Sequence, residues 1–189
     1  MTAQDFHAVV DFWFGAPGGV TNGKPRAEWF KKSADFDALI RGCFMPLHEQ
    51  AANGKLAHWR ESPLPLLAFI IVCDQFPRNM FRDSPRAFAA DALALDAARQ
   101  MRARGWDTRF NSVERQFCYL PFEHAEDLDA QRTCLTLFGE LGNVDLLHWA
   151  QKHYDIVERF GRFPHRNAVL GRASTVEEIA FLKQPGSGF

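Results

Sequence analysis

Three short segments of the chain combine arginine, histidine and carboxylate side chains with proline punctuation. The first runs from Asp74 to Arg82, the second from Glu114 to Glu126, and the third from Gly161 to Arg172. Arginine presents a planar fork that matches carboxylates and phosphates, and histidine changes its charge near neutral pH. These residue types therefore allow either anion recognition or acid–base chemistry.

The first segment follows the most apolar stretch of the chain, Leu64 to Cys73. Asp74 comes directly after this stretch, so we expect its carboxylate to be partly buried and to require a partner. Arg78 and Arg82 are the nearest cations. The simpler interpretation is an Asp74–Arg78 ion pair that locks a helix end. The alternative is that the arginines recognise a carboxylate or phosphate ligand.

In the second segment, Glu123 and His124 come shortly after a proline. Acidic neighbours could orient His124 or raise its pKa, which is the minimum for general acid–base catalysis. A lone histidine beside carboxylates is more often a surface or structural partner. The spacing of Glu123, His124 and Glu126 does not provide a good set of metal ligands on one helix face. We therefore expect no metal site.

The third segment places Arg162, His165, Arg166 and Asn167 in a loop that contains proline and glycine. Loops on a rigid scaffold often carry functional residues. The run Phe-Pro-His-Arg-Asn at 163–167 also resembles Phe-Pro-Arg-Asn at 76–79. The similarity indicates either two similar exits from helices or a shared cationic pocket, and the first is more common for proline and asparagine punctuation.

Apolar residues recur at helical spacing through most of the chain, and no strand-like alternation persists. The expected helices run from Thr2 to Gly15, Ser33 to Asn53, Ser62 to Gln75, Ser84 to Gly105, Ser112 to Pro121, Leu128 to Leu141, Asn143 to Gly161 and Ser174 to Lys183.

About eight helices with short loops predict an all-α fold of antiparallel pairs. Pro46 should kink or split its helix, and Pro77 should end the helix before it. The helix that contains Leu64–Cys73 has no polar face, so we expect it to be the central, buried element.

Composition restricts the classes of function. The chain has 189 residues, with 22 Lys and Arg against 23 Asp and Glu. A net charge of −1 argues against a nucleic-acid partner. No signal peptide and no apolar run of membrane-spanning length is visible, so we expect a single cytoplasmic domain over residues 1–189 without a membrane partner.

The four cysteines lack metal-type spacing and are expected to be buried, reduced thiols. They are Cys43, Cys73, Cys118 and Cys134.

Several motifs together resemble the bacterial family known as domain of unknown function 924. They are Asp11–Gly15, Trp29-Phe30, Asp74–Arg82, Glu114–Phe117, Pro121–Glu126, Gly161–Asn167, Leu170–Arg172, Ser174-Thr175, Glu177-Glu178 and Phe181-Leu182. The resemblance implies a superhelical array of stacked helical pairs, like that of tetratricopeptide-repeat proteins. It implies no activity, because the family has no established catalytic residues and a fold alone does not supply a function.

The leading hypothesis is a binding or scaffold domain that holds a peptide or a small anionic ligand through Arg78, Arg82, Arg162 and Arg166. The alternative is a small hydrolase or transferase that uses His124 or His165 with an acidic partner, Asp74 or Glu123. A third possibility is a structural partner in an oligomer, which would show a large exposed apolar patch. No cofactor is expected.

A site shared by all three segments requires the helices to close around Leu64–Cys73. That arrangement would bring the neighbourhoods of Asp74, Glu123 and Arg166 together at one end.

Overall fold

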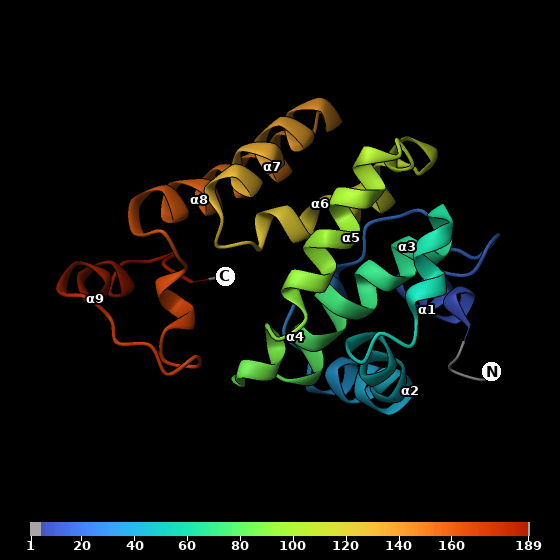
Figure 1. The fold of residues 1–189 in the computed structure, drawn as a ribbon, viewed down its shortest axis with the longest axis horizontal. Helices are drawn as coiled ribbons and strands as arrows, with labels where there is room; N and C mark the ends of the chain where they lie inside the picture. Colours follow the sequence, from blue (N-terminus) through green and yellow to red (C-terminus); the bar gives the residue numbers. More distant parts are fainter. Residues whose placement is uncertain (1–4, 189) are drawn as a thin grey trace. The chain divides into compact units, whose positions relative to one another are not determined.

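The computed structural model describes residues 5–188, and this part of the chain contains helices and no strand (Figure 1). The all-α class is therefore confirmed. The helices are α1 (Phe6–Phe14), α2 (Ala34–Ala52), α3 (Pro63–Ile70), α4 (Phe76–Met80), α5 (Asp91–Ala103), α6 (Ser112–Glu123), α7 (Leu128–Leu141), α8 (Val144–Phe160) and α9 (Val176–Leu182). The expected first residues of the first helix, from Thr2, lie outside the described part, and Asp5 is the N-cap of α1.

The chain divides into two compact units. The first unit comprises the described residues up to Arg82 together with Arg86–Pro121, and the second comprises Asp83–Pro85 and the residues from Phe122 onward. The boundary falls inside α6. The single domain over residues 1–189 stays a prediction, and so does the tetratricopeptide-repeat-like array.

The predicted helix end before Pro77 is wrong, because α3 continues into α4 through a π-helical turn, Ile71–Gln75. In this wider turn the N–H of Phe76 donates to a carbonyl five residues back. Pro77 has no N–H to donate, but the carbonyl of Val72 accepts a bond of 3.1 Å from Nδ1 of His48 on α2. When α3 and α4 are taken as one run, the described residues hold eight helices, as the pattern predicts.

The apolar stretch is the centre of the first unit, as expected. Residues 66–73 are at most 3% exposed. Trp13 of α1 packs against a set of rings that come from four other parts of this unit. They are Trp29, Phe36, Phe76 and Phe117, with ring centroids 5.6–6.1 Å from that of Trp13. Such aromatic contacts add to the free energy gained by burial.

Helix α2 continues through Pro46 without a split. Pro46 lies on the exposed side, where water can satisfy the carbonyl that loses its partner. Ser33 is the N-cap, as predicted, and its Oγ accepts from the N–H of Phe36. Cys43 is exposed on this helix, so its predicted burial is wrong, whereas the other three cysteines are buried.

Three predicted helix starts are displaced. Ser84-Pro85 opens a short 3-10 turn, and α5 begins only at Asp91. The cap of α6 is Asn111 rather than Ser112, because Oδ1 of Asn111 accepts from two N–H groups of the first turn. The capping box of α9 uses Thr175 and Glu178, one residue later than the Ser174 start that was predicted.

The second unit contains the helix pair α7 and α8, whose bounds match the prediction. Gly142 ends α7 with a φ of 73°, and Oδ1 of Asn143 caps α8 by accepting from the N–H groups of Asp145 and Leu146. A two-residue connection reverses the chain, so the two helices lie side by side and antiparallel (Figure 1).

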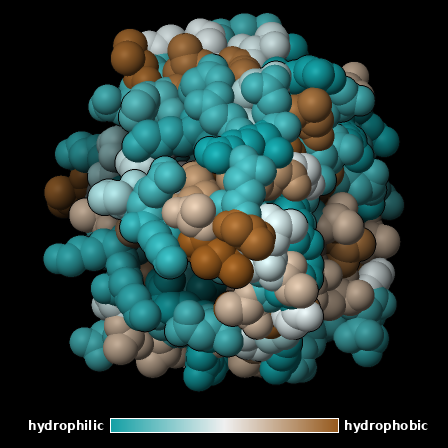
Figure 2. Space-filling view, turned by 90° about the vertical axis from the view of Figure 1, so that its left-hand side faces the viewer, coloured by the Kyte–Doolittle hydropathy of each residue, from teal (hydrophilic) through white to brown (hydrophobic). Residues whose placement is uncertain are grey.

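The face of the molecule in Figure 2 is mostly hydrophilic, and its hydrophobic atoms form small separate groups. In the second unit, α9 exposes Val176 and Ile179, and α8 exposes Val144 and Trp149. Single exposed apolar side chains of this kind are normal on protein surfaces. Within the described residues, no helix is long and apolar enough to cross a bilayer.

Candidate functional site

The turn between α6 and α7 is fixed by Gln131, a fully buried residue of α7. Its Nε2 donates to the carbonyl oxygens of Phe122, Glu123 and Ala125, at 3.3, 2.6 and 2.8 Å. These bonds satisfy two carbonyls at the end of α6, which have no partner inside the helix, and one carbonyl of the turn that follows. The turn therefore holds the backbone of Glu123 in one place, and that of His124 beside it.

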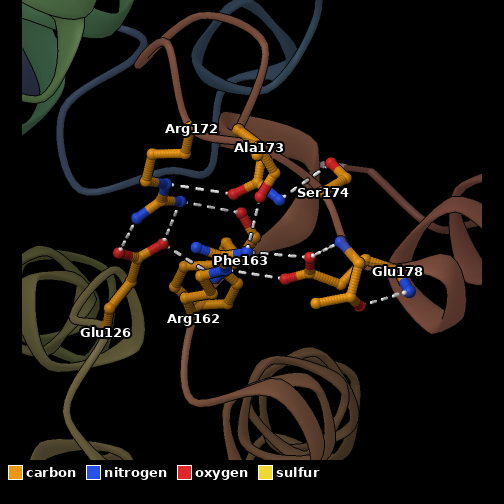
Figure 3. Close-up of polar contacts among 9 residues, drawn as sticks. Glu126, Arg162, Phe163, Arg172, Ala173, Ser174 and Glu178 are labelled. Atoms are coloured by element: carbon orange, nitrogen blue, oxygen red, sulfur yellow. Dashed lines mark hydrogen bonds and ion pairs between the residues drawn. The ribbon is translucent and has the colours of Figure 1, made fainter.

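The chain after α8 is tied to this turn by Glu126 (Figure 3). Gly161 ends α8 with a φ of 68°, and the N–H of Phe163 donates to Oε1 of Glu126 at 2.7 Å. Arg172 donates to both oxygens of the same carboxylate, at 2.6 and 2.8 Å. Burial raises the pKa of Glu126, but the bonds from Arg172 and Phe163 outweigh it and hold the pKa below its usual value.

A second carboxylate, Glu178 of α9, holds Arg162 (Figure 3). Nε and a terminal nitrogen of Arg162 donate to its two oxygens at 2.6 and 2.8 Å. These bonds, with one from the N–H of Thr175, lower the pKa of Glu178 to about 2. Asn167 donates to Ser174 at 3.0 Å and accepts from Nε of Arg172, also at 3.0 Å. Arg162 and Asn167, both predicted site residues, therefore hold the loop and α9 together.

Phe163 is fully buried and has ionisable side chains around its ring. The rings of His153 and His165 lie 5.6 Å from it, measured between centroids. The Cζ atom of Arg166 lies over the ring, 4.5 Å from its centroid. An arginine in this position gains a cation–π attraction, and Arg166 is only 7% exposed.

The end of α6 contributes the remaining members of this group. The ring of His124 lies 6.4 Å from that of His153, and Oε1 of Glu123 lies 3.6 Å from Nδ1 of His153. We call His124, His153, His165, Arg166 and Glu123 the histidine–arginine cluster. All five belong to the second unit.

The ring of His153 is held neutral. Its Nδ1 lies 2.9 Å from the carbonyl oxygen of Trp149, one turn earlier on α8. Burial, together with smaller contributions from His124, Arg166 and His165, lowers its pKa to about 3, although the bond to Trp149 opposes this effect. Their effect on this pKa indicates that the side chains of His124, Arg166 and His165 lie close enough to His153 for electrostatic interaction.

The two predicted arginines of the first unit are bonded to carboxylates. Arg78 donates to the two oxygens of Asp91 at 2.9 and 3.2 Å and lies 3.6 Å from Asp74. Burial lowers the pKa of Arg78, but the charges of Asp74 and Asp91 outweigh it and raise the pKa above its usual value. The predicted Asp74–Arg78 pair is present, and Asp91 is a second partner that sequence reasoning missed.

Arg82 has a similar arrangement. It donates to the two oxygens of Asp37 at 2.5 and 2.9 Å, and Asn79 donates to the same carboxylate at 2.8 Å. Asp37 is buried at the start of α2. Asp74, Arg78 and Arg82 lie in the first unit, whereas the other predicted residues lie in the second, so a site shared by both groups stays a prediction.

The comparisons with known proteins place the chain in a family. Residues 9–186 match the profile of a bacterial family of proteins of unknown function, DUF924. The chain belongs to this family.

A solved structure of a protein of unknown function from Agrobacterium tumefaciens is similar to this DUF924 protein. The two chains are 42% identical, and the match covers 97% of this chain and 99% of the other, with a TM-score of 0.86. No curated protein matches the chain. The DUF924 family therefore supplies the fold and leaves the function to be inferred from the site.

His153 is the residue of the DUF924 site that sequence reasoning missed. It lies between Ala150 and Val157 in the buried stripe of α8, three residues after the first and four before the second. A histidine at a core position of a helix is an available signal, because a buried imidazole requires a polar partner. Gln131 gives the same signal on α7, where it is fully buried.

Proposed function

We propose that the DUF924 protein binds a small anion, a carboxylate or phosphate group, in the histidine–arginine cluster. The observation that carries this proposal is the position of Arg166, a buried guanidinium on the ring of Phe163 among three imidazoles. Buried cations are stabilised by anions, and guanidinium groups match carboxylates and phosphates in geometry.

Two glutamates of the second unit fix the loop that carries Arg166. Glu126 lies near enough for the charge of Arg166 to affect its pKa, but both of its oxygens accept from Arg172, and one also accepts from Phe163. Glu178 is engaged by Arg162. Oε1 of Glu123 lies 3.6 Å from Nδ1 of His153.

Calorimetric titration tests the proposal at neutral pH with phosphate, sulfate, acetate and glycolate. The test variant is Arg166→Met, which keeps an apolar stem on Phe163 and removes the charge. The matched control is Arg132→Met, because Arg132 is exposed on α7 and pairs with Asp129 on its own helix. We expect at least one of the four anions to bind, with a tenfold or greater loss of affinity in Arg166→Met and no loss in the control. No binding by any of the four, or equal affinity in Arg166→Met, contradicts the proposal.

The hydrolase or transferase alternative rests on one contact, the 3.6 Å approach of Glu123 to His153. A pKa of about 3 makes His153 a weak base at neutral pH, and efficient general bases titrate near the working pH. His124 and His165 stay as predicted candidates for such a reaction. Release of one of the four anions from its ester, with the alcohol as the second product, would favour this alternative.

We also propose that the protein works in the cytoplasm and without nucleic acid. Three thiols are buried and free, as in a reducing compartment: Cys73, Cys118 and Cys134. The net charge of −1 supplies no basic excess for a nucleic-acid surface.

A further inference from the structure

One large ring of the first unit lies on the surface. Phe30 follows the 3-10 turn Ala27–Trp29 and is 65% exposed, whereas Trp29 is 6% exposed. The ring of Trp29 packs against those of Trp13 and Phe117 in the core of this unit, with centroids 5.9 and 4.7 Å away. Packing of the core therefore accounts for Trp29 but not for Phe30.

The exposed ring of Phe30 is fixed in place. It stacks on the ring of Phe117 on α6, with centroids 6.4 Å apart and planes 6° from parallel, and it meets Trp29 in an edge-to-face arrangement, also at 6.4 Å. The N–H of Phe30 donates to the carbonyl oxygen of Ala27 at 3.4 Å. A ring held in this way loses little conformational freedom when a partner binds, and aromatic anchors carry much of the binding free energy in protein interfaces.

The segment that contains Phe30 has an excess of positive charge. Residues 16–32 hold four cations and one acid, a net charge of +3 in a chain whose net charge is −1: Lys24, Arg26, Glu28, Lys31 and Lys32. Arg26 is engaged, since it donates to the carbonyl oxygen of Trp13 and pairs with Glu28. The three lysines are exposed, and within residues 5–188 no carboxylate forms an ion pair with them. Their charges are therefore available to a partner.

A fixed apolar ring beside exposed positive charge fits a peptide segment that carries an apolar side chain between carboxylates. Opposite charges steer such a segment to the surface and fix its register, while the ring supplies the apolar contact. A nucleic acid would need a strongly basic face. A bilayer would need a larger apolar area than Phe30 and Val20, the 85% exposed residue of the same segment. The acidic segment is therefore the partner that the chemistry favours.

We propose that Phe30, Lys31 and Lys32 form a docking surface for an acidic peptide segment of a partner protein. The apolar side chain of the segment packs on the exposed face of the Phe30 ring, and its carboxylates pair with the two lysines. The surface belongs to the first unit, and its occupation does not depend on the anion binding proposed for the second.

Selection on the whole chain from a phage-displayed library of random peptides tests the proposal. We expect the enriched peptides to carry Asp or Glu on both sides of an aromatic or aliphatic residue. No enrichment, or enriched peptides without acidic residues, contradicts the proposal. Sedimentation with vesicles of phosphatidylserine and phosphatidylcholine runs in parallel, and binding to vesicles with no peptide enriched would assign the surface to a lipid and overturn the proposal.

The enriched peptide of highest affinity is then measured by fluorescence anisotropy. The double variant Lys31→Glu, Lys32→Glu should bind it tenfold or more weakly. The matched control is Lys55→Glu, Lys183→Glu, which makes the same change of net charge at exposed lysines elsewhere and should stay within about twofold of the wild type. Equal losses in the two double variants would show an unspecific attraction and overturn the docking surface.

The variant Phe30→Ser tests the ring and should also lose tenfold or more in affinity for the same peptide. Leu39→Ser is its control, because Leu39 is a 51% exposed apolar residue of the same unit, and it should bind as the wild type does. Affinity unchanged in Phe30→Ser overturns the proposal. The lysine variants retain the ring, so they keep the proposal testable if Phe30→Ser does not fold.

Discussion

The two units contain similar Phe-Pro segments, but the arginines of these segments contact different groups. In the first unit, Arg78 and Arg82 each donate to both oxygens of a carboxylate, from Asp91 and Asp37 respectively. In the second unit, Arg166 lies on the ring of Phe163 among imidazoles. A guanidinium held by a fixed carboxylate stabilises the fold, whereas the proposed function assigns Arg166 to an external anion.

The difference lies in which residues approach the segment from elsewhere in the chain. Asp91 begins α5 and reaches Arg78. In the second unit the approaching helix, α8, contributes His153 from its buried face. The similar local sequences form different structures, a helix at Phe76–Met80 and a 3-10 turn at Pro164–Arg166. The surrounding helices determine which groups each arginine meets. Four predictions test this contrast, in order of the expected effect on stability.

Removal of Arg78 should produce the largest loss of stability. Arg78→Ala leaves the buried Asp74 and the half-buried Asp91 without their shared cation, so we expect a loss of about 3–4 kcal/mol in the free energy of unfolding, measured by urea denaturation. Arg132→Ala, which removes an exposed arginine, should change it by less than ~0.5 kcal/mol. A loss below ~1 kcal/mol for Arg78→Ala would contradict the assignment of Arg78 as an arginine that stabilises the fold.

His153 should make the fold sensitive to mild acid. The pKa of His153 is depressed in the folded state. Below the ordinary pKa of histidine, the unfolded chain therefore binds a proton at this residue and the folded chain does not, so protonation favours unfolding. Stability should be fully present above pH ~6.5 and fall by about 2–3 kcal/mol as the pH drops to ~4.5. Denaturation at a series of pH values measures this slope, which His153→Asn should remove and His148→Asn should not.

Glu126 and Glu178 should act in a lower pH window. Both pKa values are depressed in the folded state, so the stabilisation is present above the ordinary glutamate range and is lost as the pH falls from ~4.5 toward ~2. Glu126→Gln should cost about 1–2 kcal/mol at pH 7, because the charge-assisted bonds to Arg172 weaken. The same variant should show a smaller decrease of melting temperature between pH 5 and 3. An unchanged acid response would mean that Glu126 does not hold the loop through its charge.

Arg166→Met should cost the least stability and the most binding. The methionine keeps apolar contact with Phe163, so we expect a change of about 1 kcal/mol or less in the free energy of unfolding. Anion affinity should fall tenfold or more in the same samples. A stability loss as large as that of Arg78→Ala, measured in the same urea series, would place Arg166 with the structural arginines.

Local signals predicted the second unit well. The bounds of α7 and α8 follow from Gly142 and Asn143, which end one helix and cap the next within two residues. The start of α5 was harder, because Ser84-Pro85 is a strong local start signal that forms only a short turn. A signal within a few residues is sufficient only where no distant contact competes with it.

Distant contacts explain what the sequence could not predict. The helix continues past Pro77 because His48, on another helix, satisfies a carbonyl of the π-helical turn. Arg78 has Asp91 as its bidentate partner, thirteen residues away, as well as the nearby Asp74. The neutral state of His153 depends on burial and on the cations around it, none of which has a local signature.

The most direct test of the central claim follows the side-chain resonances of all seven histidines while phosphate, sulfate, acetate and glycolate are added in turn. Exposed His7, His58 and His148, and buried His48 of the first unit, serve as internal controls. Anion binding in the cluster predicts that the resonances of His124, His153 and His165 shift together and saturate, while the four controls stay in place. Shifts confined to the controls, or no saturable shift with any of the four anions, would contradict it.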